Sequence, residues 1–333
     1  MSGAPLLDIH DVHVWFPIRR GVFSRVRGHV RAVQGVSLQV GAGEVVGLVG
    51  ESGCGKSTLA RAVMMLQPPA QGVIRLEGRD VYAQSATGIR ELRRQVQIVF
   101  QDPYASLNPR LPVYQIITEG LIAYGMLREN EQEERARALL HDVGLGADAL
   151  YRYPHEFSGG QRQRISIARA LSMRPKLIVC DEAVSALDVS IQAQVINLLM
   201  ELKAKYGLSY LFISHDLSVV KFMADRVAVM YLGRIVEEGR CRDVMANPRH
   251  PYTQALLAAA PVAGGPRGVA PPLSGELPSV THPPSGCPFH TRCPKAMPVC
   301  RERYPDTIDQ HGHQTACHLF ASADRATTGV AIP

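Results

Sequence analysis

The fold is decided by a short glycine-rich stretch, Gly50-Glu51-Ser52-Gly53-Cys54-Gly55-Lys56-Ser57. This stretch matches the phosphate-loop pattern G-x-x-x-x-G-K-[ST], with an apolar strand expected before it at 44–49 and a helix after it at 58–63, starting at Thr58. Glycines at these positions let successive backbone N–H groups face phosphate oxygens. In such a loop Lys56 reaches the β- and γ-phosphates, and the Ser57 hydroxyl binds Mg²⁺. The stretch therefore predicts a nucleotide site in an α/β fold with a mostly parallel sheet.

A second stretch, at 177–182, is an apolar strand that ends in two adjacent carboxylates, Asp181 and Glu182. Strand ends of this kind line ligand clefts in parallel sheets. We expect Asp181 to hold Mg²⁺ through water and Glu182 to polarise the water that attacks the γ-phosphate. A solvated acidic turn is the alternative, and the intact phosphate loop upstream makes that interpretation the less favoured one.

Over about residues 5–250 the chain resembles an ABC transporter ATPase, because six motifs occur in the order of that family. They are the phosphate loop, Gln101 after a strand at 96–100, the signature Ser158-Gly159-Gly160-Gln161, the pair Asp181-Glu182, the stretch Ser185-Ala186-Leu187-Asp188, and His215 after a strand at 211–214. Segments at 101–110, 157–164 and 247–253 are also similar to the ATPase subunits of bacterial dipeptide and oligopeptide importers.

The resemblance implies that ATP and Mg²⁺ are bound between two such subunits placed head to tail. One subunit would supply Lys56, Ser57, Gln101, Asp181, Glu182 and His215. Its partner would supply the signature residues Ser158, Gly159, Gly160 and Gln161, where a helix N-terminus presents N–H groups to the γ-phosphate. Asp188 would couple the two sites across the interface.

Within that shared site the resemblance also implies individual roles. The catalytic residues would be Glu182, His215 and Gln101, and Mg²⁺ would be held by Ser57, Gln101 and Asp181. Phe16 would stack on adenine, although a core role for Phe16 or the neighbouring Trp15 stays open. Ala183 stands where many family members have proline, so we expect an altered rate rather than lost catalysis.

The chain is expected to borrow its membrane part from other proteins. It has 333 residues and 46% hydrophobic content, but no targeting signal and no apolar run of about 18 residues. The resemblance implies a peripheral ATPase subunit on the cytoplasmic face of the inner membrane that energises import of di- and oligopeptides. Expected partners are a second, related ATPase chain, two permease subunits and, indirectly, a solute-binding protein, with no nucleic acid. Pairing of two identical copies stays open.

Other functions are less favoured. Nickel or another small solute stays open as cargo, because this polypeptide need not touch what is transported. Soluble ABC ATPases that act on DNA need a long coiled coil, and those that act on ribosomes usually carry two ATPase units in one chain; neither feature is present here. A P-loop kinase leaves the signature and His215 unexplained.

The rest of the ATPase domain, placed at 5–250, divides into two smaller parts. Residues 6–49 with 72–78 show the alternation and turns of an antiparallel sheet, and a charge-rich helix at 129–140 marks a helical subdomain. By resemblance, residues 101–124 would line the groove that receives the permease. An arginine-rich run between Arg19 and Arg31 is interpreted as a solvated loop, with an anionic membrane face as the alternative.

A C-terminal extension is expected at 251–333, where the composition changes. Its segment 261–268 is linker-like. Four of the seven cysteines gather farther on, with the spacing C-x5-C-x6-C-x16-C: Cys287, Cys293, Cys300 and Cys317. Disulfides are not expected in a reducing cytosol, so a metal centre is the simplest interpretation.

Both an iron–sulfur cluster and Zn²⁺ fit four thiolates. The spacing lacks the C-x2-C pair of zinc ribbons, and importer ATPases that this chain resembles can carry a [4Fe–4S] cluster on cysteines arranged in this way. We favour the cluster over zinc and over unliganded thiols, while His311, His313 and His318 keep a mixed zinc site open. Because these cysteines are far in sequence from the phosphate-binding groups, a structural or redox-sensing role is expected.

Overall fold

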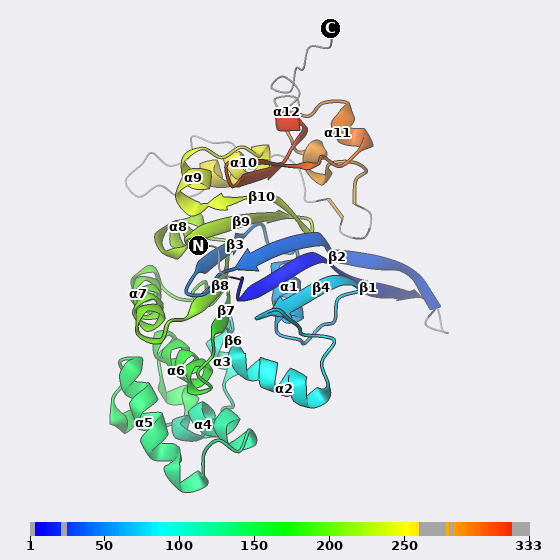
Figure 1. Cartoon of the computed structure of the whole chain (residues 1–333). Coiled ribbons are helices and arrows are strands. Elements are labelled where there is room, and N and C mark those ends of the chain that lie inside the picture. Colours follow the sequence, from blue (N-terminus) through cyan, green and yellow to red (C-terminus); the bar gives the residue numbers. More distant parts are fainter. Residues whose placement is uncertain (1–3, 21–24, 260–277, 280, 282, 322–333) are drawn as a thin grey trace.

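The computed structural model describes residues 4–20, 25–259, 278, 279, 281 and 283–321. The linker-like segment at 261–268 lies outside these residues. The described part contains two sheets, with helices packed around the larger one (Figure 1).

The larger sheet has eight strands in the order β11-β12-β10-β9-β3-β8-β7-β6. Its five parallel strands are β6 (Val96–Val99), β7 (Leu177–Asp181), β8 (Ser209–Ser214), β3 (Val45–Val49) and β9 (Arg226–Tyr231). Antiparallel strands then extend it: β10 (Arg234–Arg240), β12 (His313–Ala316) and β11 (Thr307–Gln310). All five residues of β3 are buried, as expected for a strand covered on both faces.

The smaller sheet is antiparallel, in the order β2-β1-β4-β5, but it does not extend to residue 49 as predicted, because β3 pairs in the larger sheet. Its strands are β1 (Leu7–Arg20), β2 (Arg25–Val40), β4 (Gln71–Leu76) and β5 (Arg79–Asp80).

The prediction of a solvated arginine-rich loop was wrong. Strand β1 ends at Arg20 and strand β2 begins at Arg25, and their register places Arg20 opposite Arg25. Basic residues and histidine occupy the odd positions from 25 to 31, whereas Val26, Gly28 and Val30 occupy the even ones. This two-residue alternation is that of a strand, so the sequence pattern itself indicated the beginning of β2.

Helices lie around the larger sheet and beyond its β6 edge (Figure 1). They are α1 (Lys56–Val63), α2 (Ala86–Gln95), α3 (Pro103–Ser106), α4 (Val113–Ala123), α5 (Gln132–Asp142), α6 (Gly159–Ser172), α7 (Val189–Tyr206), α8 (Leu217–Met223), α9 (Cys241–Ala246), α10 (Pro251–Ala259), α11 (Val299–Glu302) and α12 (His318–Ala321). Single 3-10 turns occur at Glu129–Glu131, Ala147–Ala149, Pro154–Glu156 and Pro288–Thr291. The expected helix at 129–140 is present as the first of these turns followed by α5.

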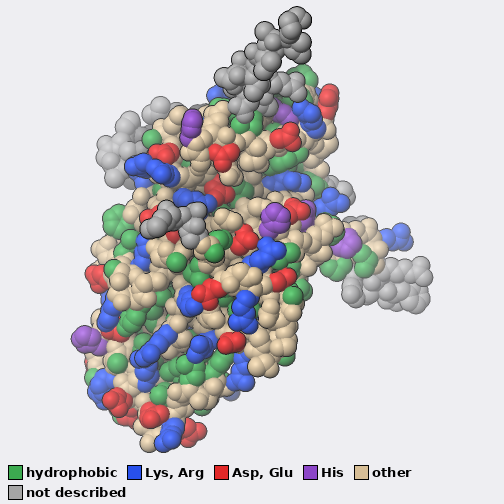
Figure 2. Space-filling model, viewed as in Figure 1, with side chains coloured by type: hydrophobic (Ala, Val, Ile, Leu, Met, Phe, Trp, Pro, Cys, Tyr) green, Lys and Arg blue, Asp and Glu red, His purple; other side chains and the backbone are tan. Residues whose placement is uncertain are grey.

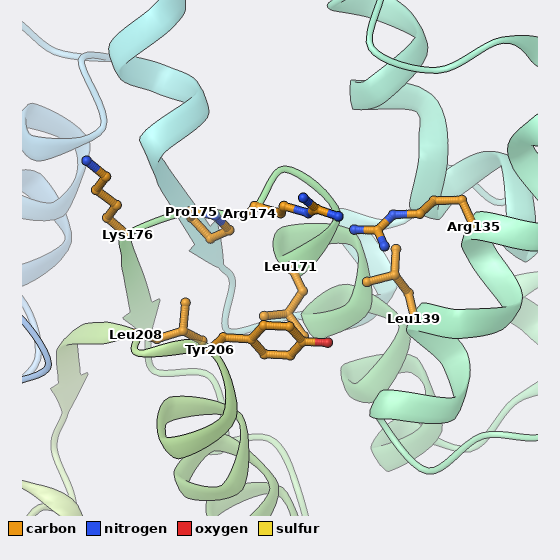
Figure 3. A pocket seen from close by; sticks show the side chains of 8 residues that line it. All are labelled: Arg135, Leu139, Leu171, Arg174, Pro175, Lys176, Tyr206 and Leu208. Carbon is orange, nitrogen blue, oxygen red and sulfur yellow. The ribbon is translucent and has the colours of Figure 1, made fainter.

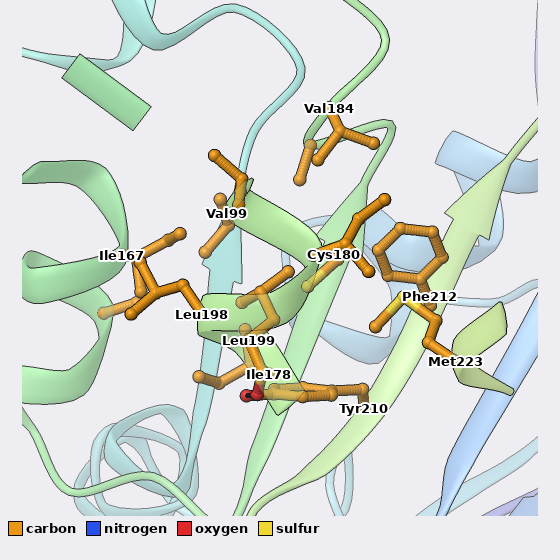
Figure 4. Packing of buried hydrophobic residues seen from close by; sticks show 14 of the residues in the cluster. Val99, Ile167, Ile178, Cys180, Val184, Leu198, Leu199, Tyr210, Phe212 and Met223 are labelled. Atoms are coloured by element: carbon orange, nitrogen blue, oxygen red, sulfur yellow. Dashed lines mark hydrogen bonds between the residues drawn. The ribbon is translucent and has the colours of Figure 1, made fainter. Parts of the chain in front are cut away.

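A continuous apolar core joins the helical part to the larger sheet. Figure 4 shows side chains of β6, β7 and β8 packed against those of α6, α7 and α8, including Ile167, Leu198 and Phe212. The buried hydroxyl of Tyr210 donates a hydrogen bond of 2.8 Å to the carbonyl of Leu199, which ties β8 to α7. A second core lies between the smaller sheet, α1 and the opposite face of the larger sheet. The parallel strands are thus held from both sides.

The C-terminal elements pack onto the ATPase part. Strand β12 pairs with β10, with Glu237 opposite Thr315. In the described ranges no helix is both long and apolar enough to cross a bilayer. Figure 2 shows acidic and basic side chains interspersed over the viewed face.

Candidate functional site

The predicted phosphate-binding motifs meet at one edge of the larger sheet. Strands β3, β8, β7 and β6 run parallel, so the loops at their carboxyl ends open on the same side. The register pairs Val49 with Ser214, Asp181 with Ile213 and Val99 with Cys180. Sheet topology therefore brings together the phosphate loop, the carboxylate pair, His215 and Gln101, as expected of a parallel α/β sheet.

The phosphate loop passes close to neighbouring backbone. Gly55 has φ +108°, and a Cβ placed there would lie 2.2 Å from the carbonyl oxygen of Ala32 in β2. Only glycine fits such a position. Lys56 is 4% exposed, and its Nζ donates to the carbonyl oxygens of Gly50 at 2.8 Å and Glu51 at 3.0 Å. The lysine ammonium is thus held inside the loop, where phosphate oxygens would replace these carbonyl partners.

Two oxygen donors for Mg²⁺ lie side by side. Ser57 Oγ donates to Asp181 Oδ1 at 3.0 Å, although 124 positions separate the two residues. Burial raises the pKa of Asp181, with Ser57 opposing the shift and the neighbouring Glu182 adding to it. A bound cation would relieve this cost, because positive charge favours the carboxylate. Hydroxyl and carboxylate oxygens are the ligands that Mg²⁺ prefers, so this pair fits the ion.

Glu182 is held by its backbone beside His215. It lies in the left-handed region at φ +50°, which is uncommon for a residue with a side chain. Its N–H donates to the carbonyl of Ile213 at 3.0 Å, and its carbonyl accepts from Ser185. The carboxylate is 15% exposed, and its Oε2 lies 3.3 Å from Nδ1 of the half-exposed His215. The geometry suits a base whose orientation is controlled by the histidine.

Gln101 lies beyond the end of β6, next to the Asp181 edge, and is exposed. The adjacent Asp102 caps the short helix α3 by accepting from Tyr104 N at 2.7 Å. The structure therefore places Gln101 at the correct sheet edge, on a loop leading into the helical part.

The signature begins helix α6 with a capping box. Ser158 Oγ accepts from Gln161 N at 3.4 Å, and Gln161 Oε1 accepts from Ser158 N at 3.0 Å. Gly160 is buried, and a Cβ there would lie only 2.4 Å from a methyl group of Ile191, so a larger residue would not fit. Among the described residues, none of the side-chain hydrogen bonds of this signature reaches the phosphate loop of the same chain. Ser158 and Gly159 are exposed.

Two further predicted residues have local roles in the single chain. Asp188 is the exposed N-cap residue of α7, where its carbonyl accepts from Gln192 N at 2.8 Å. Phe16 is partly buried and packs against the core between the two sheets. Trp15, on the other side of β1, lies 5.7 Å from the Arg31 guanidinium.

Sequence reasoning missed a contact between the C-terminal extension and the phosphate loop. Arg292 donates to both carboxylate oxygens of Glu51, at 2.7 and 3.0 Å, and its side chain is 4% exposed. Tyr252 in α10 accepts from Glu51 N at 2.8 Å. The cysteine-bearing segment, although far in sequence from the phosphate loop, thus contacts it through Arg292, the residue before Cys293.

The four C-terminal cysteines converge, and all are free thiols. They line one small cavity together with His250, Phe289 and His318. Burial raises the pKa of Cys287 to about 11 against a hydrogen bond from Phe289 N, and that of Cys317 to about 11 against one from Leu319 N. Cys300 Sγ accepts from Met297 N at 3.5 Å. Within the described ranges, however, no three His, Cys, Asp or Glu side chains are arranged to hold a single metal ion.

A cavity of about 530 Å³ lies away from this edge (Figure 3). Its lining includes Pro175 and Lys176, just before β7, and Leu208, just before β8. It therefore opens at the amino ends of the parallel strands. Because the phosphate loop lies at the carboxyl ends, this cavity is not the nucleotide site.

Two family descriptions match the chain: "ABC transporter" over residues 33–185, and "Oligopeptide/dipeptide transporter, C-terminal region" over residues 236–300. The oligopeptide transport ATP-binding protein AppF of Bacillus subtilis is 51% identical, covering 95% of this chain and 98% of the relative. OppF of Salmonella typhimurium, an oligopeptide transport ATP-binding protein, is 49% identical over 94% and 95%. The dipeptide transport ATP-binding protein DppF of Escherichia coli is 47% identical over 94% of each chain.

Solved structures agree with these similarities. One is cbiO1 of Clostridium perfringens, part of the ABC transporter complex cbiONQ, with a TM-score of 0.63 and 29% identity over 74% of this chain and 92% of that one. Another is a dimeric ATP-binding cassette in a post-hydrolysis state with ADP and Pi, with a TM-score of 0.62 and 26% identity over 71% of this chain and 99% of that one.

Proposed function

This chain belongs to the family of ABC transporter ATP-binding proteins, and from that membership we propose that it hydrolyses ATP to energise import of di- and oligopeptides through a separate permease. The main support is that two pairs of side chains are in contact at one edge of the sheet: Ser57 with Asp181, and Glu182 with His215. The cargo class rests on the peptide-transport names of relatives that match nearly the whole chain. Nickel as cargo has no such support.

The residues at this edge divide the chemistry between them. Lys56 would bind the β- and γ-phosphates, while Ser57, Asp181 and Gln101 would hold Mg²⁺, whose positive charge neutralises the phosphates. Glu182 would accept a proton from the attacking water, and His215 would hold Glu182 and contact the γ-phosphate. Phe16 would stack on adenine. Ala183, buried beside Glu182, keeps a backbone N–H at the position where proline would remove it.

We propose that the site is completed by a second ATPase subunit. The exposed Ser158 and Gly159 begin α6, a 14-residue helix whose N-terminus favours an anion. Near them Val189, which follows Asp188, is 83% exposed, an unusual state for an apolar residue unless a partner covers it. The partner would present the same elements in return, whether it is a second copy or a related chain.

The permease would dock beside Gln101. Phe100, directly before the segment 101–124, is 39% exposed, and Tyr104 within it is 58% exposed. Exposed aromatic rings here favour a protein contact. Closure of the ATPase pair around ATP would then move this segment and the permease with it. Such docking would place the chain peripherally at the cytoplasmic face of the inner membrane.

Co-purification and reconstitution test this function. Tagged permease should recover the chain from solubilised membranes, and the vesicle-reconstituted complex should hydrolyse ATP faster with peptide-loaded binding protein. The Lys56→Ala chain should assemble but show little turnover, which makes it the matched control. Recovery of the chain with ribosomes or DNA and no membrane protein would contradict the proposal. ATP hydrolysis stimulated by nickel but not by peptides would show that nickel is the cargo.

We further propose that residues 251–333 form an extension of the ATPase domain (5–250) that carries a [4Fe–4S] cluster on Cys287, Cys293, Cys300 and Cys317. The support is that these thiols line one cavity and that backbone N–H groups face the sulfurs, as they do around cluster thiolates. Zinc would need all its ligands about 2.3 Å from one ion, an arrangement the described residues do not offer. A cluster binds each thiolate at a different iron, so its ligands lie farther apart.

Iron analysis separates the alternatives. Protein purified without oxygen should be brown, absorb near about 400 nm and contain about four irons per chain. Cys293→Ser should lose iron, because a hydroxyl replaces a soft thiolate poorly, whereas Cys241→Ser should keep it. Colourless protein with one zinc would favour zinc, and colourless protein without metal would reject both.

A further inference from the structure

The phosphate loop carries one carboxylate, that of Glu51. Glu51 is the residue after Gly50, and its carbonyl accepts from Lys56 Nζ at 3.0 Å. Its carboxylate is 21% exposed. A triphosphate approaching this loop would meet that negative charge in a partly desolvated place, where repulsion between like charges is strong. A second cation is therefore needed to neutralise the Glu51 carboxylate, so that Lys56 stays available to bind the phosphates.

Arg292 supplies that cation from the C-terminal extension. Its two terminal nitrogens contact the two oxygens of Glu51 at 2.7 and 3.0 Å, which is the fork geometry of a strong, oriented ion pair. At 4% exposure the arginine has little water to compete with the carboxylate. Arg292 thus neutralises the carboxylate charge of Glu51 and fixes the orientation of its side chain.

The surroundings hold Arg292 firmly in place. Arg292 N donates to the carbonyl of Phe289 at 3.0 Å, at the end of the turn 288–291 that follows Cys287. The Phe289 ring packs against Tyr252 at 5.4 Å between centroids, and the Tyr252 hydroxyl accepts from Glu51 N at 2.8 Å. Side chain and backbone of Glu51 are therefore both fixed by residues beyond position 250.

We propose that Arg292 is a positioning residue for the phosphate loop, through which the C-terminal extension sets the ATP affinity of the site. This inference rests on the proposed ATPase function. Arg292 holds the Glu51 carboxylate away from the phosphates and neutralises its charge. Folding of the cysteine-bearing segment therefore affects ATP binding directly. The extension is then part of the ATP site rather than an appendage.

The test compares affinity for Mg-ATP, measured with a fluorescent ATP analogue, and the KM and kcat of ATP hydrolysis in the assembled transporter. Arg292→Gln leaves the Glu51 charge unpaired and should weaken ATP binding about tenfold or more, with a smaller change in kcat. The double variant Glu51→Gln/Arg292→Gln should recover most of the lost affinity, because no carboxylate remains to repel the phosphates.

Two controls separate positioning from folding. Arg301→Gln removes an exposed arginine of the same segment and should leave affinity unchanged. Arg292→Lys keeps the charge without the fork and should lie between wild type and Arg292→Gln. Wild-type affinity in Arg292→Gln, or a folded double variant without recovery, would overturn the inference. A wild-type chain that binds no ATP would instead remove the proposed function, and this inference with it.

Discussion

At the scale of single residues, Glu182 shows how backbone strain serves chemistry. Its φ of +50° turns the chain sharply after β7, and the hydrogen bond to Ile213 holds that turn. The carboxylate then lies 3.3 Å from His215 instead of continuing along the strand. A strained residue persists where its neighbours over-determine it and is common at active sites. Here the strain places the proposed base.

Substituting this base should separate binding from turnover. Glu182→Gln preserves size and hydrogen bonding but removes the proton acceptor, so kcat should fall by about 10²- to 10⁴-fold while ATP still binds. Steady-state hydrolysis and nucleotide binding in the assembled transporter measure both quantities. The exposed Glu201 offers a matched control, since Glu201→Gln should change neither. Wild-type turnover in Glu182→Gln would show that another group is the base.

At the scale of elements, the site depends on how firmly β8 and α7 are joined. His215 follows β8, and Asp188 begins α7, so relative movement of these two elements would displace both. The buried hydroxyl of Tyr210 donates to the carbonyl of Leu199 near the middle of α7 (Figure 4). Burial also raises the pKa of Tyr210, which keeps the phenol protonated and able to donate.

Removing this hydroxyl should cost stability more than chemistry. Tyr210→Phe leaves the Leu199 carbonyl without that buried partner, so the free energy of unfolding should fall by about 1 kcal/mol. ATP turnover per folded molecule should stay near that of the wild type. Tyr151→Phe is the control, because its hydroxyl bonds Glu133 at an exposed site and should change stability by less than about 0.5 kcal/mol. Denaturant titration of both variants provides the comparison, and equal losses would contradict the assignment.

At the scale of the whole molecule, the proposed shared site draws on two separate parts of the chain. The phosphate loop, Asp181 and Glu182 lie at the carboxyl edge of the sheet, whereas the exposed Ser158 begins α6. Neither half is equipped to surround a triphosphate alone. A head-to-tail pair would bring each half against the other half of its partner.

A defect in the signature should therefore appear at the partner's site. Ser158→Arg would fill the γ-phosphate position across the interface, leaving ATP binding to its own phosphate loop intact but blocking hydrolysis in trans. Mixed assemblies with Lys56→Ala subunits allow the two sites to be followed separately. If each substitution impaired only the site on its own chain, the shared site would be rejected.

Local sequence by itself determined the elements that carry chemistry. The phosphate loop between β3 and α1, and the carboxylates that end β7, depend on contacts within a few residues, so spacing and alternation predict them. The alternation at 25–31 is equally local and indicates the beginning of β2. The many basic residues in this segment favoured a loop instead. The roles across the dimer came from resemblance, since no short-range pattern indicates which distant strand ends meet.

Tertiary structure alone decided what joins positions far apart. Ser57 reaches Asp181 because β3 and β7 are parallel with β8 between them. Arg292 reaches Glu51 across 241 positions, and the C-terminal strands add to the sheet through β10. An arginine in a cysteine-rich segment has no sequence feature that marks it as a partner of the phosphate loop. Such a pair forms because packing buries both charges together, and burial is a property of the whole fold.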